Sequence, residues 1–328
     1  MAIDPELFRL NRMDDAFHNQ PSPGAFEWWY FDAIFDNGYS MVTSWHIDEM
    51  GTETASPESR YIKFAIYDPD GKKTDTEVRF PVSTVFASTK TCDVKMGDNR
   101  LHGEFPRYEI HFRSDDIGGD LFFENLTQGM RNPPDGVLYF GREPDKYMGW
   151  VIAQPRARVT GKLILAGEEI PVDGVGYHDH NWGNVPLQEL YDHWHWGRIF
   201  LPGHTFLFST GESARSIGSQ RICVLIAFKG ERLLRISSRI DAEPSDLEAD
   251  KLTGDKYPRK LVLKVTARNI SGEVILRLKK LIESPAAYPE AAKEHRYFRF
   301  LSDCDVNLDM AGEKIEADTQ VIHELMIP

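Results

Sequence analysis

Short segments in which apolar and polar residues alternate make up most of this 328-residue chain, and turn-forming residues separate them. Alternation with a period of two is typical of a β-strand that buries one face. The segment 27–47 is broken by Asp36-Asn37-Gly38, which predicts a hairpin, and residues 158–165 and 168–177 predict another across Ala166-Gly167. The pattern therefore predicts strands joined by tight turns.

Strands of the same character are expected along the rest of the chain. They are predicted at residues 61–67, 77–80, 107–113, 121–125, 148–151, 193–200, 205–210, 221–228, 232–240, 261–267, 273–280, 297–309 and 315–326. Helical periodicity is scarce, and the best helix candidate, residues 286–294, is too short to connect parallel strands. The expected fold class is all-β, with antiparallel strands arranged as barrels or sandwiches.

The length of the chain exceeds the size at which a single hydrophobic core usually keeps growing, so two domains are expected. The natural division follows the densest motif of the sequence, near residues 186–190. We expect an N-terminal arm at residues 1–25, a first β domain at residues 26–187 and a second at residues 188–328. The interior of a small barrel suits an apolar ligand.

Charge and composition narrow the classes of partner. A net charge of −13 argues against nucleic acid or an anionic membrane as partner, because such binding needs clustered Lys and Arg. No apolar run reaches the ~18 residues of a membrane-spanning helix, so no stable membrane insertion is expected. Cys92, Cys223 and Cys304 are far apart and odd in number, which favours neither a disulfide framework nor a zinc knuckle. With no signal-like N-terminus, a cytoplasmic location is expected.

The densest chemistry lies in two neighbouring stretches, Gly176-Tyr177-His178-Asp179-His180-Asn181-Trp182-Gly183 and Asp192-His193-Trp194-His195-Trp196-Gly197-Arg198. They hold four of the 11 His and three of the seven Trp of the chain. If the first stretch is extended, Tyr177, Asp179 and Asn181 share one face, and His178, His180 and Trp182 share the other. A carboxyl group beside a phenol suits general acid–base chemistry if apolar surroundings raise its pKa.

Other interpretations of this motif stay open. The cluster could simply satisfy buried backbone groups at a domain junction. The pairs His178/His180 and His193/His195 could supply four imidazoles to zinc or iron, but no distinctive third-ligand spacing accompanies them, so no metal is expected. A serine triad is disfavoured, because the sequence contains no Gly-x-Ser-x-Gly elbow.

A second concentration of aromatic residues lies near the start of the predicted fold. In Phe26-Glu27-Trp28-Trp29-Tyr30-Phe31-Asp32, alternation places Glu27, Trp29 and Phe31 on one face and Trp28, Tyr30 and Asp32 on the other. Because both faces are aromatic, one is expected to line the core and the other a cavity or the partner domain. Glu27 is a second candidate acid within an apolar wall. Trp45 and Trp150 are further aromatic candidates.

The motif Glu27–Asp32 and the stretch from Gly176 to Arg198 together resemble the signature of the carotenoid 1,2-hydratase (hydroxyneurosporene synthase) and AttH-like family, over roughly residues 25–200. The resemblance implies two lipocalin-like β-barrels in tandem, an apolar cavity at or near their junction, and no redox cofactor. Relatives hydrate isoprenoid double bonds or prenylated phenolics, and fungal members promote Diels–Alder closure of polyenes. The family's Tyr-x-Asp falls on Tyr177 and Asp179. Where the carotenoid hydratases carry a His two residues before a Trp, this chain has Met148 before Trp150, so carotenoid hydration itself is not implied.

The sequence thus predicts a cofactor-independent enzyme that acts on a C=C bond of a hydrophobic terpenoid, polyene or prenylated substrate, by hydration or cyclisation. Asp179, held by Tyr177, is the expected proton donor, with His178 and His180 as proton partners and Glu27 as a second acid. The expected substrate-binding residues are Trp28, Trp29, Tyr30, Trp45, Trp150, Trp182, His193, Trp194, His195 and Trp196.

Two alternatives to acid–base catalysis remain. One is a pericyclase that preorganises a polyene, and the other is a lipocalin-type carrier of an apolar ligand that does no chemistry. In each case the expected partner is a hydrophobic small molecule, and the chain would act alone or as a homodimer.

Overall fold

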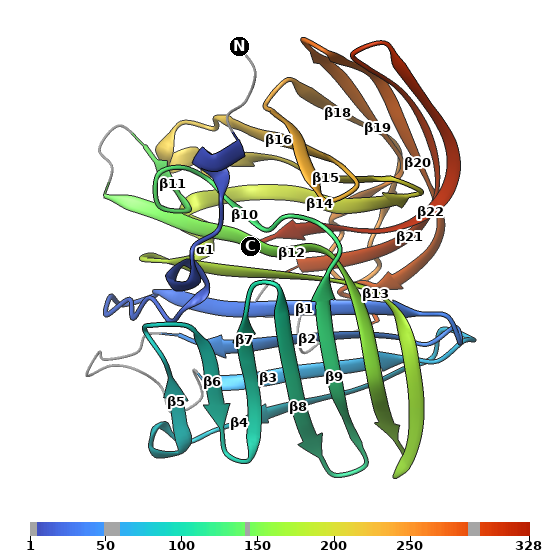
Figure 1. Cartoon of the computed structure of the whole chain (residues 1–328). Coiled ribbons are helices and arrows are strands. Elements are labelled where there is room, and N and C mark those ends of the chain that lie inside the picture. Colours follow the sequence, from blue (N-terminus) through green and yellow to red (C-terminus); the bar gives the residue numbers. More distant parts are fainter. Residues whose placement is uncertain (1–4, 49–59, 142–144, 288–295) are drawn as a thin grey trace. The chain divides into compact units, whose positions relative to one another are not determined.

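The computed structural model describes residues 5–48, 60–141, 145–287 and 296–328 (Figure 1). The chain divides into two compact units: an N-terminal unit, Asp4–Pro186, and a C-terminal unit that contains Leu187–Pro328. Both consist of antiparallel strands, so the predicted all-β class is confirmed. No helix among the described residues has the length and apolar character needed to cross a membrane.

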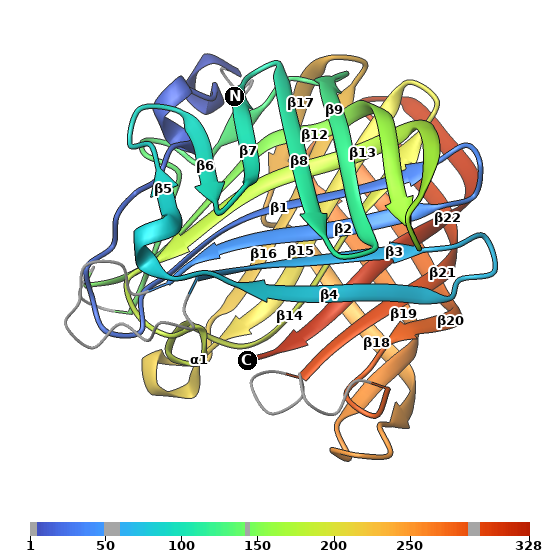
Figure 2. The same ribbon diagram turned by 90° about the horizontal axis from the view of Figure 1, so that it is seen from below.

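The N-terminal unit is one antiparallel sheet that curls around its core (Figures 1 and 2). Its path is β4-β3-β2-β1-β13-β12-β9-β8-β7-β6-β5, with β10 and β11 paired to β12. The strands are β1 Phe26–Phe35, β2 Ser40–Ile47, β3 Arg60–Tyr67, β4 Lys73–Arg79, β5 Val85–Ala87, β6 Cys92–Met96, β7 Asn99–Glu104, β8 Arg107–Ser114, β9 Ile117–Asn125, β10 Met130–Arg131, β11 Val137–Phe140, β12 Lys146–Leu165 and β13 Glu168–Gly183. Strand β13 lies in the middle of this sheet, between β1 and β12.

Alternation on β1 decides which side chains form the core of this unit. Trp29 and Phe31 are fully buried, and Ala33 and Phe35 continue the same face into a cluster that takes apolar residues from most strands of the sheet. The segment before Phe26, expected to be an arm, packs into the unit instead. It forms the 3₁₀ helices η1 Pro5–Phe8 and η2 Arg12–Asp15, and Asp15, Ala16 and Phe17 are buried.

The C-terminal unit is a second antiparallel sheet with the path β17-β16-β15-β14-β22-β21-β20-β19-β18. Its strands are β14 Tyr191–Leu201, β15 His204–Ser213, β16 Arg221–Lys229, β17 Arg232–Ser237, β18 Ile240–Ala249, β19 Lys256–Ala267, β20 Ile270–Glu283, β21 Arg296–Met310 and β22 Glu313–Ile327. The short helix α1 Leu187–Leu190 precedes β14. Alternating apolar residues of these strands fill one large cluster and one smaller cluster, which contains Tyr257, Phe298, Phe300 and Leu325.

Most predicted strands are confirmed, including both hairpins. Gly38 and the pair Ala166-Gly167 have positive φ angles at these turns, as tight hairpins require. Five short strands, β5 to β7, β10 and β11, were not predicted. The segment 232–240 is not one strand, because β17 ends at Ser237, and β18, which begins at Ile240, continues to Ala249 where no strand was predicted. The predicted helix 286–294 lies mostly outside the described residues.

Candidate functional site

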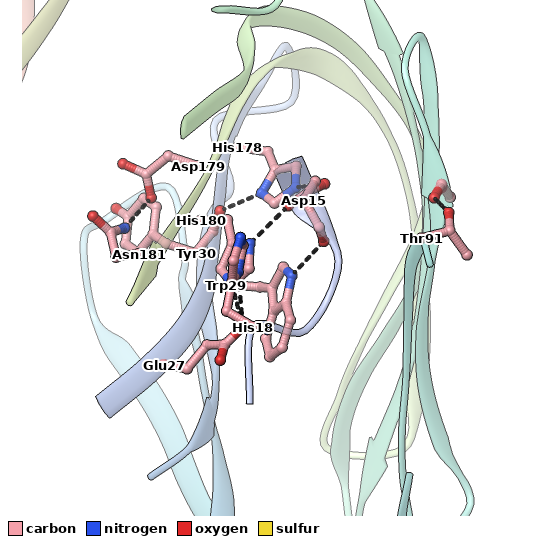
Figure 3. A network of polar contacts seen from close by, with 11 residues as sticks. Asp15, His18, Glu27, Trp29, Tyr30, Thr91, His178, Asp179, His180 and Asn181 are labelled. Atoms are coloured by element: carbon pink, nitrogen blue, oxygen red, sulfur yellow. Dashed lines mark hydrogen bonds and ion pairs between the residues drawn. The ribbon is translucent and has the colours of Figure 1, made fainter. Parts of the chain in front are cut away.

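Strand β13 brings the two faces of the predicted motif to the centre of the N-terminal sheet. Asp179 is the cross-strand partner of Tyr30 on β1, and Asn181 is the partner of Trp150 on β12. Because paired residues point to the same side of a sheet, Tyr30, Trp150, Asp179 and Asn181 share one face, which we call the Asp179 face. Figure 3 shows Asp179 on one side of the strand and His178 on the other, so the predicted alternation is confirmed.

Asp179 is held by three hydrogen-bond donors. Its Oδ2 accepts hydrogen bonds from the Tyr177 hydroxyl and from Trp150 Nε1, each at 2.8 Å. Its Oδ1 accepts one from Asn181 Nδ2 at 2.9 Å. Beside this group, the Tyr30 hydroxyl donates to Asp32 Oδ2 at 2.8 Å. The carboxyl group is thus fixed in one orientation by side chains of β12 and β13.

Burial makes the carboxyl group of Asp179 a weaker acid than an ordinary aspartate. The residue is only 6% exposed, and burial raises the pKa of its carboxyl group to about 6, although the hydrogen bonds from Tyr177, Trp150 and Asn181 act in the opposite direction. A carboxyl group with a pKa near 6 can hold a proton close to neutral pH and still release it. This is the property that the sequence analysis required of Asp179.

The opposite face of β13 carries a buried network of imidazoles and carboxylates. His178 donates from Nδ1 to the Tyr30 carbonyl oxygen and lies with Nε2 3.0 Å from Asp15 Oδ2. His180 lies between two carboxylates, with Nε2 3.0 Å from Glu27 Oε1 and Nδ1 3.3 Å from Asp15 Oδ1. All of these side chains except that of Tyr30 are almost fully buried. We call Asp15, Glu27, His178 and His180 the core network (Figure 3).

The charges of the core network follow from these contacts. Burial alone would lower the pKa of His180, but hydrogen bonds to Asp15 and Glu27 outweigh it and raise this pKa to about 9. Burial would raise the pKa of both carboxylates, yet their imidazole partners lower it below the ordinary value. Glu27, expected to be a second acid, is therefore held as a carboxylate, because its apolar wall also contains His18 and His180. This state does not suit proton donation.

Aromatic rings enclose the core network. Trp29 stacks on His180 with ring centroids 4.3 Å apart, and its Nε1 donates to the Asp15 carbonyl oxygen at 3.1 Å. Phe31 stacks on His178 at 3.7 Å. The indole of Trp182 stacks at 3.6 Å on a further imidazole, that of His18, whose Nδ1 lies 3.3 Å from Glu27. The core network is thus a buried group of polar side chains that aromatic rings of the apolar core surround.

The family of this chain follows from a comparison of its sequence with known proteins. The profile of the AttH-like family matches residues 14–288, which is more than half of the chain and includes both faces of β13. This chain belongs to the AttH-like family. The resemblance predicted from the two motifs is thereby confirmed.

Individual relatives of this AttH-like chain differ in the reactions that their names describe. Hydroxyneurosporene dehydrogenase of Chlorobaculum tepidum is 27% identical over 219 residues, which are 57% of this chain and 57% of that protein. The quinolone epoxide rearrangement protein of Emericella nidulans is 25% identical over 194 residues, 53% of this chain and 50% of that protein. The chain thus matches these curated relatives over only about half of their length.

A solved structure supports the fold of the whole AttH-like chain. Kievitone hydratase from Nectria haematococca has a TM-score of 0.63 at 14% identity, and the match covers 100% of this chain and 95% of that one. Together with the family assignment, this likeness establishes the predicted lipocalin-like architecture. At this level of identity it establishes the fold alone.

The remaining predicted residues of the AttH-like chain fall into two groups. In the N-terminal unit, Trp45 is fully buried in the core, whereas Trp28 stacks against His46 with centroids 5.9 Å apart. The other group, His193, Trp194, His195 and Trp196, lies on β14 of the C-terminal unit. The two pairs of histidines predicted as alternative metal ligands therefore belong to different units.

Two trios of side chains have the spacing that a metal ion would need. The donor atoms of Asp15, Cys92 and His178 lie within 4.8 Å of one another, and so do those of His18, Glu27 and His180. Most of these atoms already face one another as imidazole–carboxylate pairs at 3.0 to 3.3 Å. We therefore interpret both trios as parts of a hydrogen-bonded network.

Asp15 and His18 were missed by the sequence analysis, because they precede the first strand in a segment that shows no strand alternation. The only signal was the apolar pair Ala16-Phe17 between two ionisable residues. The 3₁₀ helix η2 ends at Asp15 and places its carboxylate beside His178 and His180, which come 163 and 165 residues later in the chain. A contact of that separation has no local signature.

Proposed function

We propose that this chain is an enzyme in which Asp179 protonates a C=C bond of a hydrophobic, unsaturated substrate such as a terpenoid, polyene or prenylated aromatic compound. The single observation that carries the proposal is the Asp179 carboxyl group itself. It is buried, its pKa is raised to about 6, and three side-chain donors fix its orientation. Burial keeps the proton available, and the donors stabilise the carboxylate that remains after proton transfer.

In the proposed reaction, the O–H bond of Asp179 breaks while a C–H bond forms at one carbon of the alkene. The adjacent carbon becomes a cation, which aromatic faces such as those of Trp150 and Trp28 stabilise electrostatically. Water then adds to the cation and returns a proton to the carboxylate, which yields an alcohol. The sum is the addition of water without oxidation or reduction, so the proposed chemistry requires no redox cofactor.

The same first step can lead to another product. If a second double bond of the substrate attacks the cation, loss of a proton to Asp179 gives a cyclic isomer, and no water is incorporated. Protonation of an epoxide oxygen by the same acid would start a rearrangement. The names of kievitone hydratase and of the quinolone epoxide rearrangement protein support these two outcomes, hydration and isomerisation, as the classes to test.

The test is to incubate the purified chain with a panel of prenyl and polyene substrates in ¹⁸O-labelled water and to analyse the products by mass spectrometry. Incorporation of ¹⁸O indicates hydration, and an unlabelled isomer indicates cyclisation or rearrangement. Asp179→Asn is expected to lower turnover by at least about 100-fold, which is the lower range for loss of a general acid. Substrate that binds without any product would favour the carrier.

A matched control lies on the same strand. Asp173 pairs with Arg158 at the surface, its side chain is 49% exposed, and Asp173→Asn should leave turnover unchanged. For the native enzyme, the rate should fall about tenfold per pH unit above pH 6, because the protonated fraction of Asp179 decreases there. Near-normal turnover of Asp179→Asn would show that Asp179 is not the proton donor, as a pericyclase would predict.

A further inference from the structure

A row of four polar side chains crosses the inside of the C-terminal unit. Thr210, His195, His323 and Ser302 lie on β15, β14, β22 and β21, which are consecutive strands of the sheet. His195 is the cross-strand partner of Thr210, and His323 is the partner of Gly197, two residues along β14. We call these four side chains the polar row.

Alternation along each strand shows that the polar row faces the core of the unit. On β21, Ser302 lies between Phe300 and Cys304, and on β22, His323 lies between Val321 and Leu325. In both cases one neighbour belongs to the large apolar cluster and the other to the small one. The row therefore separates the two apolar clusters of the unit with a band of hydrogen-bonding groups.

Three atoms of the polar row are buried without a partner among the described residues. They are Nδ1 of His195, Nδ1 of His323 and Oγ1 of Thr210, in residues that are 6%, 3% and 2% exposed. Within the row, Ser302 Oγ and His323 Nε2 form a hydrogen bond at 2.8 Å. Buried polar groups nearly always have a partner, because each one left without a partner destabilises the fold. Three in one row indicate a site that another molecule completes.

The chemistry of that molecule follows from the state of the imidazoles. Burial lowers the pKa of His195 and of His323 to about 3, and the neighbouring imidazoles act in the same direction. Both rings are therefore neutral near pH 7, and a charged group would not be stabilised. A neutral imidazole has one N–H and one lone pair, so the row can both donate to and accept from a hydroxyl group.

The surroundings of the row suit an apolar body attached to that hydroxyl. Phe300 packs on His323 with ring centroids 4.9 Å apart, and Tyr257, Phe298 and Leu325 complete the small cluster on this side. Gly197 allows this arrangement, because a Cβ there would lie 2.7 Å from His323 Cβ and 2.6 Å from Phe208 Cζ. The absence of a side chain at Gly197 therefore lets His323 lie close to the backbone of β14.

We propose that the polar row is a binding site, inside the C-terminal unit, for the hydroxyl group of a neutral and largely apolar alcohol. The hydroxyl would contact His195, His323 and Thr210, and the hydrocarbon part would lie against the small aromatic cluster. This site is on a different unit from Asp179, and its occupation does not depend on the function proposed for that residue.

The probe is 1-decanol, titrated into the full-length chain labelled with ¹⁵N-histidine. Long-range ¹H–¹⁵N spectra should show the Nδ1 signals of His195 and His323 shifting together and saturating, with each signal assigned from the variants His195→Phe and His323→Phe. n-Decane, which has no hydroxyl group, should leave these signals in place.

The decisive variant is Thr210→Val, which keeps the shape of the side chain and removes only the hydroxyl. It should weaken decanol binding about tenfold, as expected for the loss of one buried hydrogen bond. Thr266→Val, at an exposed position of β19, is the matched control and should bind like the native chain. The proposal is overturned if saturating decanol leaves both imidazole signals unmoved, which would mean that the row holds only water, or if Thr210→Val binds decanol as tightly as Thr266→Val.

Discussion

Replacing Glu27 by Gln tests the core network, because it removes one of the two carboxylates that hold His180 and leaves the size of the side chain unchanged. In the native chain the Glu27 carboxylate lies 3.0 Å from His180 Nε2, and it also accepts a hydrogen bond from the His18 backbone N–H at 2.8 Å. The substitution leaves a buried imidazolium with a single carboxylate partner, Asp15. Breaking a buried ion pair in this way typically costs about 3–5 kcal/mol.

The pH dependence of the free energy of unfolding tests whether His180 is the charged group that Glu27 stabilises. The pKa of His180 is raised from 6.5 to about 9, and a shift of this size corresponds to about 3 kcal/mol of stability, at roughly 1.4 kcal/mol per pH unit. Because the folded-state pKa is raised, this stability is fully present below pH 6.5 and is lost as the pH rises to 9. The native chain should therefore lose stability across this window, and Glu27→Gln should lose much less.

The assay is urea unfolding at several values between pH 6 and pH 9.5, followed by tryptophan fluorescence. Five of the seven Trp lie in the N-terminal unit, so the signal reports mainly on the unit that contains the network. Glu124→Gln is the control, because Glu124 forms an exposed pair with Arg107 and should change the free energy of unfolding by less than about 1 kcal/mol. A difference between native chain and Glu27→Gln that stays constant from pH 6.5 to 9 would refute the assignment of charge to His180.

Two further substitutions test the site and the packing behind it. Trp150→Phe removes one of the three donors to Asp179, so the pKa of this carboxyl should rise above its present value of about 6. The midpoint of the pH–rate profile should move upward with it, and an unchanged midpoint would show that the Trp150 hydrogen bond is dispensable. Gly149→Ala places a Cβ 1.9 Å from the Trp182 ring and should destabilise the chain by about 3 kcal/mol or more in thermal unfolding. Gly167→Ala, with nothing within 4 Å but a φ of +80°, should cost only about 1–2 kcal/mol, and equal melting temperatures would contradict the predicted clash.

Local pattern was enough to predict the two faces of β13. Tyr177, Asp179 and Asn181 have a period of two, and the backbone geometry of any strand brings such residues together. The turn at Ala166-Gly167 was equally local, because a tight two-residue hairpin needs positive φ angles and glycine adopts them readily. Where one or two neighbouring residues decide the geometry, the sequence is sufficient.

The environment of Glu27 could not be predicted in the same way. Its sequence neighbours are aromatic, which suggested a neutral acid in an apolar wall. The groups that decide its charge are His18 and His180, which come from a segment outside the strands and from a strand 153 residues away. Only the folded chain brings them together, so the sign of the pKa shift depended on tertiary contacts. The hydrogen-bond donors of Asp179 differ in this respect, because Trp150, Tyr177 and Asn181 lie on a single hairpin, whereas the burial that raises the pKa of Asp179 again depends on the folded chain.

That hairpin, β12–β13, places the proposed acid in a particular position during folding. Trp150, Tyr177, Asp179 and Asn181 all lie on its two strands, and the contact between Trp150 and Asp179 closes only 29 residues of chain. Short loops cost little entropy to close and form before distant contacts do. The proposed catalytic group can therefore assemble from one contiguous segment of about 40 residues, and transferring that segment between members of the family would carry the acid and its donors as a single inherited part.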